Sequence, residues 1–267
     1  MLKGKSAIVT GSTSGIGIGI ATALAEQGAD VLLNGFGDGD RIDTLRHRLE
    51  QQHRVRVRYS AADMSRPDAI RAMVDYARGE FGKIDIIVNN AGIGYSVEPA
   101  VSMQDVLGTS EEDWNTVINI NLTSVFLTSR YGIPEMLKSG GGSIVNVASA
   151  HGLTASPFKS AYVAAKHGMV GLSRAVALEV AEHGVTCNTV CPGYVKTPLV
   201  EQQIADQARA HGISPENVVR DVMLVHQARK EFVRVEELAA LAVFLCSDAG
   251  ASMTGTALAM DGGWTLH

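Results

Sequence analysis

The chain is poor in cysteine and in aromatic residues, with three cysteines among 267 residues and 5% Phe, Trp and Tyr. The number of cysteines is odd, and no two of them form a Cys-x-x-Cys motif: they are Cys187, Cys191 and Cys246. The sequence therefore predicts neither a disulfide framework nor a thiolate metal site. We interpret the three as small buried residues of a protein in a reducing compartment.

Long hydrophobic runs and excess positive charge are also lacking. No run approaches the roughly 18 apolar residues that a membrane span needs. The first residues lead into a short apolar run and a glycine loop, without the apolar block and cleavage site of a signal peptide. With 23 Lys and Arg against 28 Asp and Glu, the net charge is −5, so neither nucleic acid nor an anionic membrane is an expected partner. We expect a cytoplasmic globular protein.

What the sequence does contain is an alternation of short apolar runs with helical stretches. Seven runs rich in Val, Ile and Leu predict strands, at 6–11, 31–35, 55–63, 84–92, 143–149, 185–193 and 256–263. The helical patterns lie near 15–28, 40–52, after Pro67, 111–138, 160–182 and 235–247. This alternation predicts an α/β fold, a doubly wound parallel sheet covered by helices on both faces. No linker or repeat divides the chain, so we expect one domain over 1–267.

The segment TGSTSGIG at 10–17 follows the first predicted strand and opens the first predicted helix. Gly11, Gly15 and Gly17 permit a tight turn, close approach of the backbone to a phosphate, and close packing of helix on strand. Free N–H groups at the helix N-terminus favour a pyrophosphate. A glycine cluster alone indicates only a tight turn, but this context predicts a Rossmann-type dinucleotide site.

The end of the second predicted strand, Leu33-Asn34-Gly35-Phe36, bears on the choice of cofactor. It has neither the acidic residue of an NAD site nor an arginine for the 2′-phosphate of NADP. Asp38 and Asp40 nearby would repel a phosphate, so we favour NAD. Phe36 either lies along the adenosine or simply packs in the fold. Asp63, after the third strand, is placed to accept a hydrogen bond from the adenine amino group.

Six motifs occur in the order and approximate spacing of one enzyme family. They are TGSTSGIG, NNAG at 89–92, NIN at 119–121, Ser149, Tyr162-Val-Ala-Ala-Lys166 and PG at 192–193. Together they resemble the short-chain dehydrogenase/reductase family over essentially the whole chain, whereas a Tyr-x-x-x-Lys pair alone would mean little. The resemblance implies oxidation of an alcohol or reduction of a ketone with a nicotinamide cofactor. It also implies the catalytic residues Asn121, Ser149, Tyr162 and Lys166.

The chemistry explains those residue types at that spacing. Tyr162 and Lys166 are four residues apart on one predicted helix, so both side chains point to the same face. A phenol has an unperturbed pKa of about 10, and a nearby ammonium lowers it by favouring the phenolate. Tyr162 can then remove the hydroxyl proton as hydride leaves carbon. Ser149 can hydrogen-bond the same substrate oxygen, and by resemblance Asn121 holds a water behind the lysine.

The expected cofactor site combines the glycine loop with residues that follow the strands. Asn90, Ala91 and Gly92 close the fourth predicted strand beside the adenosine ribose. The whole set comprises Gly11, Thr13, Ser14, Gly15, Ile16, Gly17, Phe36, Asp63, Met64, Asn90, Ala91, Gly92, Tyr162, Lys166, Pro192, Gly193, Val195 and Thr197. The scattered histidines lack ligand spacing, so no metal is expected.

Four further residues resemble those that surround a short 3-hydroxy acid in some members of the family: His151, Lys159, Gln203 and Trp264. With Ser149 and Tyr162 they form the expected substrate site. Lys159 offers a cation for a carboxylate, and Trp264 an apolar wall that limits chain length. Three of them also have a structural explanation: His151 as a loop cap, Lys159 as a solvated charge and Trp264 as a subunit contact. The substrate favoured is (R)-3-hydroxybutyrate, interconverted with acetoacetate.

One departure from the resemblance keeps other substrates open. Related enzymes usually carry a glutamine at the position of Gly94, and the loop 93–110 is longer than usual. Tyr95, Ser96 or Gln104 could replace the lost contact, or the pocket accepts a longer hydroxy or oxo acid. A 3-oxoacyl thioester reduced with NADPH and a nucleotide-sensing scaffold without turnover are the remaining alternatives.

The polar helical segment 194–230 is interpreted as a lid over the cofactor and substrate, with a hinge at His211-Gly212. A charged helix is more often just a solvated face, so this interpretation depends partly on the resemblance. The resemblance also implies a homotetramer. The apolar helix at 235–247 and the last strand fit a subunit interface and fit a buried core equally well.

Overall fold

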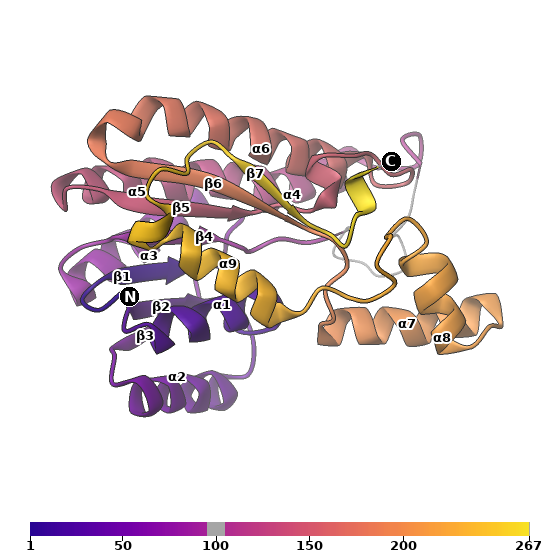
Figure 1. Cartoon of the computed structure of the whole chain (residues 1–267), viewed down its shortest axis with the longest axis horizontal. Helices are drawn as coiled ribbons and strands as arrows, with labels where there is room; N and C mark the ends of the chain where they lie inside the picture. Colours follow the sequence, from indigo (N-terminus) through magenta and orange to yellow (C-terminus); the bar gives the residue numbers. More distant parts are fainter. Residues whose placement is uncertain (95–104, 267) are drawn as a thin grey trace.

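The structure is a computed structural model in which residues 1–94 and 105–266 are described, the side chains of Leu199, Ala210 and His211 excepted (Figure 1). In these ranges seven strands form one sheet, in the order β3-β2-β1-β4-β5-β6-β7, and every pair is parallel. The strands are β1 (Ser6–Val9), β2 (Asp30–Asn34), β3 (Val57–Ser60), β4 (Ile86–Asn89), β5 (Gly142–Val147), β6 (Val185–Pro192) and β7 (Ala257–Met260). The predicted parallel sheet of seven strands is confirmed.

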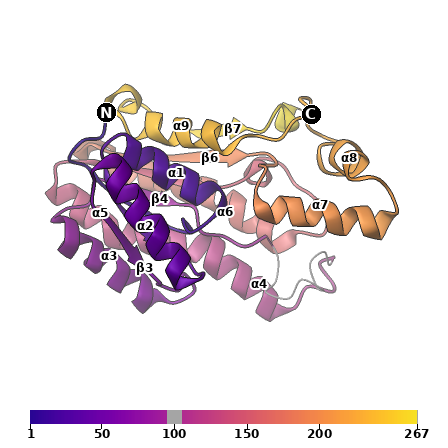
Figure 2. The same cartoon turned by 90° about the horizontal axis from the view of Figure 1, so that it is seen from below.

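Helices cover both faces of this sheet (Figures 1 and 2). One face carries α1 (Gly15–Glu26), α2 (Gly39–His53) and α9 (Val235–Leu245), and the other carries α3 (Pro67–Phe81), α5 (Ser124–Lys138) and α6 (Ser160–Val180). The remaining helices are α4 (Glu111–Ile118), α7 (Pro198–His211) and the single turn α8 (Pro215–Asn217).

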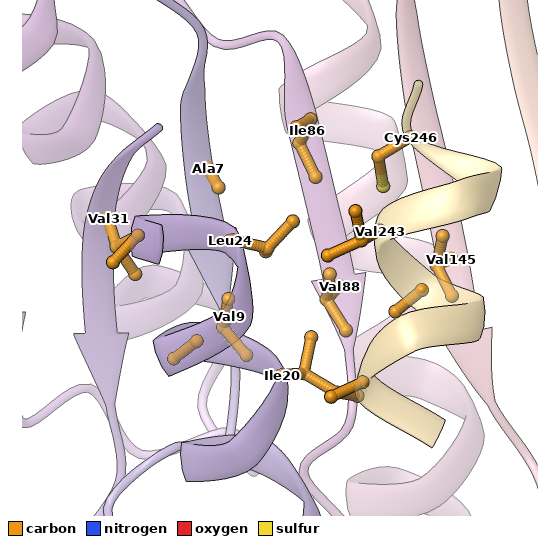
Figure 3. Packing of buried hydrophobic residues seen from close by; sticks show 14 of the residues in the cluster. Ala7, Val9, Ile20, Leu24, Val31, Ile86, Val88, Val145, Val243 and Cys246 are labelled. Carbon is orange, nitrogen blue, oxygen red and sulfur yellow. The ribbon is translucent and has the colours of Figure 1, made fainter. Parts of the chain in front are cut away.

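The strands are apolar on both sides because each side packs under helices. Ile8, Ile87 and Ile144 point toward α3, α5 and α6, whereas their neighbours Val9, Val88 and Val145 point toward α1 and α9. Figure 3 shows Ile20 and Leu24 of α1 and Val243 of α9 over the second set. Successive residues of a strand face opposite sides, so a run of Val and Ile without polar interruption fits a doubly covered sheet.

The three cysteines are buried as free thiols, which confirms their interpretation as small interior residues. Burial raises the pKa of Cys187 and of Cys246 to about 12 and that of Cys191 to about 11. At neutral pH these thiols are therefore protonated and poor nucleophiles.

The helix predicted over 111–138 is wrong in one respect, because a π-helical turn at Asn119–Thr123 separates α4 from α5. Inside it Asn121 donates from Nδ2 to the carbonyl of Val117 (3.0 Å) and to that of Ile93 (2.9 Å). A π-turn inserts an extra residue into the helix and commonly marks a functional site. Apolar spacing alone does not show it.

The segment between β6 and α9 leaves the carboxyl end of the sheet and returns to it. It carries α7, α8 and a π-helical turn at Val218–Met223 around a small apolar cluster of its own. Figures 1 and 2 show α7 and α8 beyond the ends of the strands. Where the segment starts and ends, Val195 and Val233 pair in a parallel bridge. No helix in the described ranges is long and apolar enough to cross a membrane.

Packing of α1 against α9 gives a first testable prediction. A Cβ added at Gly19 would overlap Cγ1 of Val235, the first residue of α9, whereas one at Gly79 in α3 would meet nothing within 4 Å. We expect Gly19→Ala to lower the free energy of unfolding by about 1–3 kcal/mol, because the overlap at this half-buried contact forces the two helices to shift. Gly79→Ala should raise it by up to about 1 kcal/mol, since alanine is the better helix former.

Urea unfolding of the two variants and of the unsubstituted protein measures both changes. Equal stabilities of the two variants would show that the two helices are not in close contact at Gly19.

Candidate active site

A cavity of about 280 Å³ opens at the carboxyl ends of β4, β5 and β6. It lies beside the point where the strand order turns back between β1 and β4, which is where doubly wound sheets bind ligands. Its walls come from segments far apart in the sequence. They are Ile16, Asn90, Gly92–Gly94, Asn121, Val147–Ser149, His151, Lys159, Tyr162, Lys166, Pro192–Val195, Thr197, Val200, Gln203 and Trp264.

The glycine loop is packed so closely that side chains would not fit. Gly11 has a φ of +62°, and a Cβ there would lie 2.8 Å from Cα of Ala91. A Cβ on Gly17 would overlap the carbonyl oxygen of Gly11. Asn90 donates from Nδ2 to the carbonyls of Thr10 and Gly11, both at 3.0 Å, and so fixes the loop to the end of β4.

After this loop, the first backbone N–H groups of α1 receive no capping hydrogen bond from the side chain that precedes the helix. Ser14, the residue that precedes the helix, is extended, and its side chain makes no capping hydrogen bond to the described residues. The first N–H groups of α1 are thus left to a ligand rather than to a side chain. A pyrophosphate fits this arrangement, since both the N–H groups and the helix dipole favour an anion.

Tyr162 and Lys166 lie on consecutive turns of α6, with Lys166 Nζ 5.5 Å from the centre of the Tyr162 ring. Lys166 is only 3% exposed, and its ammonium donates to the carbonyl of Val147 at 3.0 Å. Burial lowers the pKa of Lys166 from 10.5 to about 8. Its positive charge is therefore sensitive to pH in the weakly alkaline range.

Ser149 and Asn121 complete the group of four expected catalytic residues, and all four line the cavity. Ser149 follows β5, and its hydroxyl oxygen accepts from the backbone N–H of His151 at 3.2 Å. Asn121 Oδ1 is buried and has no hydrogen-bond partner among the described residues. A Cβ at Gly92 would lie 2.6 Å from this oxygen and 3.6 Å from Lys166 Nζ, so both atoms border the space beside Gly92.

The expected substrate residues line the same cavity as the catalytic group. Trp264 is stacked on Tyr194, with ring centres 5.4 Å apart and an angle of 25°, and contacts His151 edge-on at 5.3 Å. His151 in turn contacts the ring of Tyr162 edge-on at 6.1 Å. Lys159 and Gln203 contribute to the same lining. The structure thus brings together all six residues expected to hold the substrate.

The charged side chains of the described cavity lining are all positive. His151 is 5% exposed, and burial together with the positive charge of Lys159 lowers its pKa from 6.5 to about 4. The imidazole is therefore neutral at pH 7 and can donate one hydrogen bond without carrying charge. Among the described lining residues this leaves Lys159 and Lys166 as the charged groups, with no carboxylate.

Half of the expected cofactor residues lie outside this cavity, around the ends of β1, β2 and β3. Phe36 is 67% exposed, so packing in the core does not explain it, and its carbonyl accepts from Thr13 Oγ1 at 2.9 Å. One carboxylate oxygen of Asp63 accepts from the backbone N–H and the hydroxyl of Ser65. Met64 is buried in the core, which leaves only its backbone for a cofactor. The others are Gly11, Ser14, Gly15, Gly17 and Ala91.

Asn34, at the end of β2, binds the protein itself. Its Oδ1 accepts from the N–H of Gly11 at 3.2 Å, and its Nδ2 donates to the carbonyls of Ser60 (3.1 Å) and Ala62 (2.9 Å). The side chain is fully buried. The position that often selects between NAD and NADP therefore joins the glycine loop to β3 and presents no charge to a ribose.

Sequence reasoning missed several lining residues. Tyr194 was recognised only as the start of the segment 194–230, and Ile93, Val147, Ala148 and Val200 were not singled out. Four of these five residues lie at the carboxyl end of β4, β5 or β6 or within four residues after it, and that position is the signal that could have found them, whereas Val200 lies on α7. Gly94 lines the cavity, and a Cβ there would meet none of the described atoms within 4 Å. Tyr95, Ser96 and Gln104 lie outside the described residues.

Comparisons with known proteins agree with this geometry. A family model described as enoyl-(acyl carrier protein) reductase matches residues 11–265. The chain is 51% identical over 263 residues to a D-beta-hydroxybutyrate dehydrogenase of Rhizobium meliloti, with 98% of this chain and 99% of the relative covered. It is 49% identical over 267 residues to a protein of the same name from Cupriavidus necator, with 100% of both chains covered.

Solved structures show the same fold. The crystal structure of L-sorbose reductase from Gluconobacter frateurii, complexed with NADPH and L-sorbose, superposes with a TM-score of 0.91 at 30% identity and covers 98% of this chain and 97% of that one. The chain belongs to the short-chain dehydrogenase/reductase family of oxidoreductases. The family indicated by the six sequence motifs is thereby confirmed.

Burial of His151 gives a second prediction. The pKa of its imidazole is about 4 in the folded protein and about 6.5 in the unfolded chain. Between these two pH values the unfolded chain therefore binds more protons than the folded protein. The free energy of unfolding should therefore rise with pH across this window, by at most about 1.4 kcal/mol per pH unit from this residue. His151→Gln should flatten that rise.

Urea unfolding at several values from pH 4.5 to pH 7 measures the two slopes. The difference between variant and unsubstituted protein isolates His151 from the carboxylates, which titrate in both. Identical slopes would contradict a histidine held neutral by burial.

Proposed function

We propose that the protein is an NAD-dependent dehydrogenase of short 3-hydroxy acids, which converts (R)-3-hydroxybutyrate to acetoacetate and back. The observation that carries this proposal is the small cavity whose described lining has lysines as its charged groups. A carboxylate suits such a lining, because a charge-assisted hydrogen bond to an ammonium is stronger than a neutral one. Two relatives of about 50% identity that are named D-beta-hydroxybutyrate dehydrogenase support the same substrate.

Binding of the acid divides between a polar end and an apolar end. Lys159 provides the cation for the carboxylate, and neutral His151 and Gln203 provide hydrogen bonds to it. The stacked rings of Trp264 and Tyr194 form an apolar wall for the short carbon chain. The C3 hydroxyl is then directed toward Ser149 and Tyr162, whose ring contacts His151.

Proton transfer is assigned to Tyr162. Bound NAD would supply the hydride acceptor, since the hydride chemistry belongs to the nicotinamide. As the C3–H electron pair leaves and the C=O bond forms, the tyrosine oxygen takes the hydroxyl proton while the Ser149 hydroxyl donates to the same substrate oxygen. Lys166 favours the phenolate through its positive charge. Reduction of acetoacetate reverses each of these steps.

Asn121 is proposed to act behind the lysine. Its Oδ1 is a buried acceptor without a described partner, and it borders the same space beside Gly92 as Lys166 Nζ. A water in this space would accept from the ammonium and donate to Asn121. The proton taken up by Tyr162 could then pass through Lys166 to that water.

NAD rather than NADP is favoured by the region around Asn34. The side chain of Asn34 forms hydrogen bonds within the protein. Four residues later, Asp38 caps α2 by accepting from the N–H of Arg41 at 2.9 Å. A 2′-phosphate near this carboxylate would be repelled. The same reasoning disfavours a 3-oxoacyl thioester reduced with NADPH.

The segment 194–230 is proposed as a lid. It brings Val200 and Gln203 of α7 into the cavity lining, and Gly212 ends α7 with a φ of +64°. Closure would exclude water from the reacting groups. The protein is further proposed to be cytoplasmic and homotetrameric, with the exposed apolar side chains of Phe126 on α5, Leu178 on α6 and Phe244 on α9 available to subunit interfaces.

A longer hydroxy or oxo acid is the second candidate substrate. Gly94 lines the cavity where related enzymes usually carry a glutamine, and the smaller residue favours a longer or branched acid at this position. An acid of this kind would still use Lys159 for its carboxylate.

Reduced-nicotinamide absorbance tests the proposal directly. The protein is incubated with (R)- and (S)-3-hydroxybutyrate, each with NAD and with NADP. Turnover of the R acid with NAD is the expected result, and it would also exclude a scaffold that binds the nucleotide without chemistry. Binding of NAD with no turnover of either acid would overturn the substrate and direct the search to longer acids.

Lys159 provides the third prediction. Because Lys159→Met removes a charge-assisted hydrogen bond worth about 1.5–3 kcal/mol, the KM for 3-hydroxybutyrate should rise roughly 10- to 100-fold. The KM for its uncharged methyl ester should change little. Lys138→Met, at the exposed end of α5, is the matched control and should leave both constants unchanged. Equal effects on acid and ester would show that Lys159 does not bind the carboxylate.

A further inference from the structure

Gln227 is a buried amide outside the cavity and outside the residues considered so far. It is 1% exposed, and its Nε2 donates to the carbonyls of Arg229 (3.0 Å) and Glu231. Its Oε1 is buried without a hydrogen-bond partner among the described residues. An unsatisfied buried acceptor costs about 1–3 kcal/mol, whereas an apolar side chain here would leave the carbonyls of Arg229 and Glu231 without the two hydrogen bonds that the amide donates. The role of this side chain therefore lies in its hydrogen bonds and not in filling volume alone.

The amide lies against the backbone of two other segments. A Cβ at Gly193, where the chain leaves β6, would be 3.0 Å from Gln227 Oε1. A Cβ at Gly262, in the turn after β7, would be 2.5 Å from its Nε2. Gln227 thus fills the junction between the start of the segment 194–230, its return at 229–231, and the turn after β7. Figure 1 shows the turn after β7 near the return of this segment, and residues 261–263 line one surface hollow with Gln227, Arg229 and Glu231.

The turn after β7 is connected to this junction by hydrogen bonds. The N–H of Arg229 donates to the carbonyl of Gly262 at 2.8 Å. Within the turn the Asp261 carboxylate accepts from the N–H of Gly263 (3.0 Å) and from the N–H (2.9 Å) and hydroxyl (2.7 Å) of Thr265. Trp264 lies between these two residues, so the position of the turn sets the position of its ring.

The same junction reaches the second ring of the apolar wall. The N–H of Val233 donates to the carbonyl of Tyr194 at 2.9 Å, beside the Val195–Val233 bridge. Tyr194 directly follows Gly193, and its ring stacks on Trp264. His226, the neighbour of Gln227, also faces Trp264, with ring centres 6.1 Å apart. Both rings of the wall are therefore attached to backbone that packs around one amide.

We propose that Gln227 is a positioning residue that holds Trp264 and Tyr194 in place and thereby sets the length of the acid that the pocket accepts. It acts through the backbone of Gly193 and Gly262 and touches neither substrate nor cofactor. The effect on acid length rests on the proposed function, whereas the effect on Trp264 does not.

The test uses Gln227→Met, which keeps the volume but removes both donors and the acceptor. It is made in a Trp114→Phe background, in which Trp264 is the remaining tryptophan of the sequence. Gln202→Met, on the exposed surface of α7, is the matched control because it makes the same change within the same segment. Steady-state kinetics with (R)-3-hydroxybutyrate and (R)-3-hydroxyhexanoate are combined with the Trp264 emission spectrum.

For Gln227→Met we expect the KM for the four-carbon acid to rise about tenfold. The kcat/KM for the six-carbon acid, divided by that for the four-carbon acid, should rise by a similar factor. The KM for NAD should stay within twofold, and the Trp264 emission should shift to longer wavelength. Gln202→Met should change none of these. Where Gln227→Met does not fold, Gln227→Asn, an amide one methylene shorter, is measured with shifts expected in the same direction.

An unchanged length ratio together with an unchanged Trp264 emission would overturn the proposal. So would parallel losses for both acids and for NAD, since these indicate general destabilisation. If the unsubstituted protein turns over neither acid, the proposed function fails and the emission spectra alone decide the positioning role. A shift in Gln227→Met but not in Gln202→Met then supports it, and unchanged spectra overturn it.

Discussion

The hydrogen bond from the Lys166 ammonium to the carbonyl of Val147 is the interaction on which the rest of the site depends. It joins α6 to the end of β5, and so fixes the distance between Tyr162, one turn before the lysine, and Ser149, two residues after the valine. A buried ammonium is unfavourable unless it is hydrogen-bonded, and the lowered pKa of Lys166 expresses that cost. The bond therefore orders the site and stabilises the charged ammonium, whereas burial acts in the opposite direction and lowers its pKa to about 8.

The sheet provides the frame for this bond. Because β4, β5 and β6 are parallel neighbours, the loops that carry Gly92, Ser149 and Gly193 all emerge at one edge. The π-turn then rotates Asn121 into the same space, and the turn after β7 adds Trp264. Each group comes from a different element, so precise placement depends on the packing of the whole sheet rather than on any one loop.

Much of this could be predicted from the sequence, because the relevant signals are local. Val and Ile runs such as 86–88 define strands, and the spacing of Tyr162 and Lys166 places both on one face of a helix. The π-turn, the neutral state of His151 and the role of Gln227 could not be predicted. They depend on burial and on groups that are distant in the sequence and meet only after folding, such as the carbonyl of Ile93 for Asn121 and Gly262 for Gln227, and the neutral state of His151 follows first from its burial.

The engagement of Asn34 couples cofactor choice to the stability of the fold. Its amide uses both functional atoms to join the glycine loop to the chain after β3. An aspartate there would lose the two donations to Ser60 and Ala62 and set a carboxylate against those carbonyls. This scaffold therefore cannot exchange residue 34 freely to alter its nucleotide preference. Such a change has to be made at the neighbouring exposed residues 36–38, whose side chains do not hold strands together.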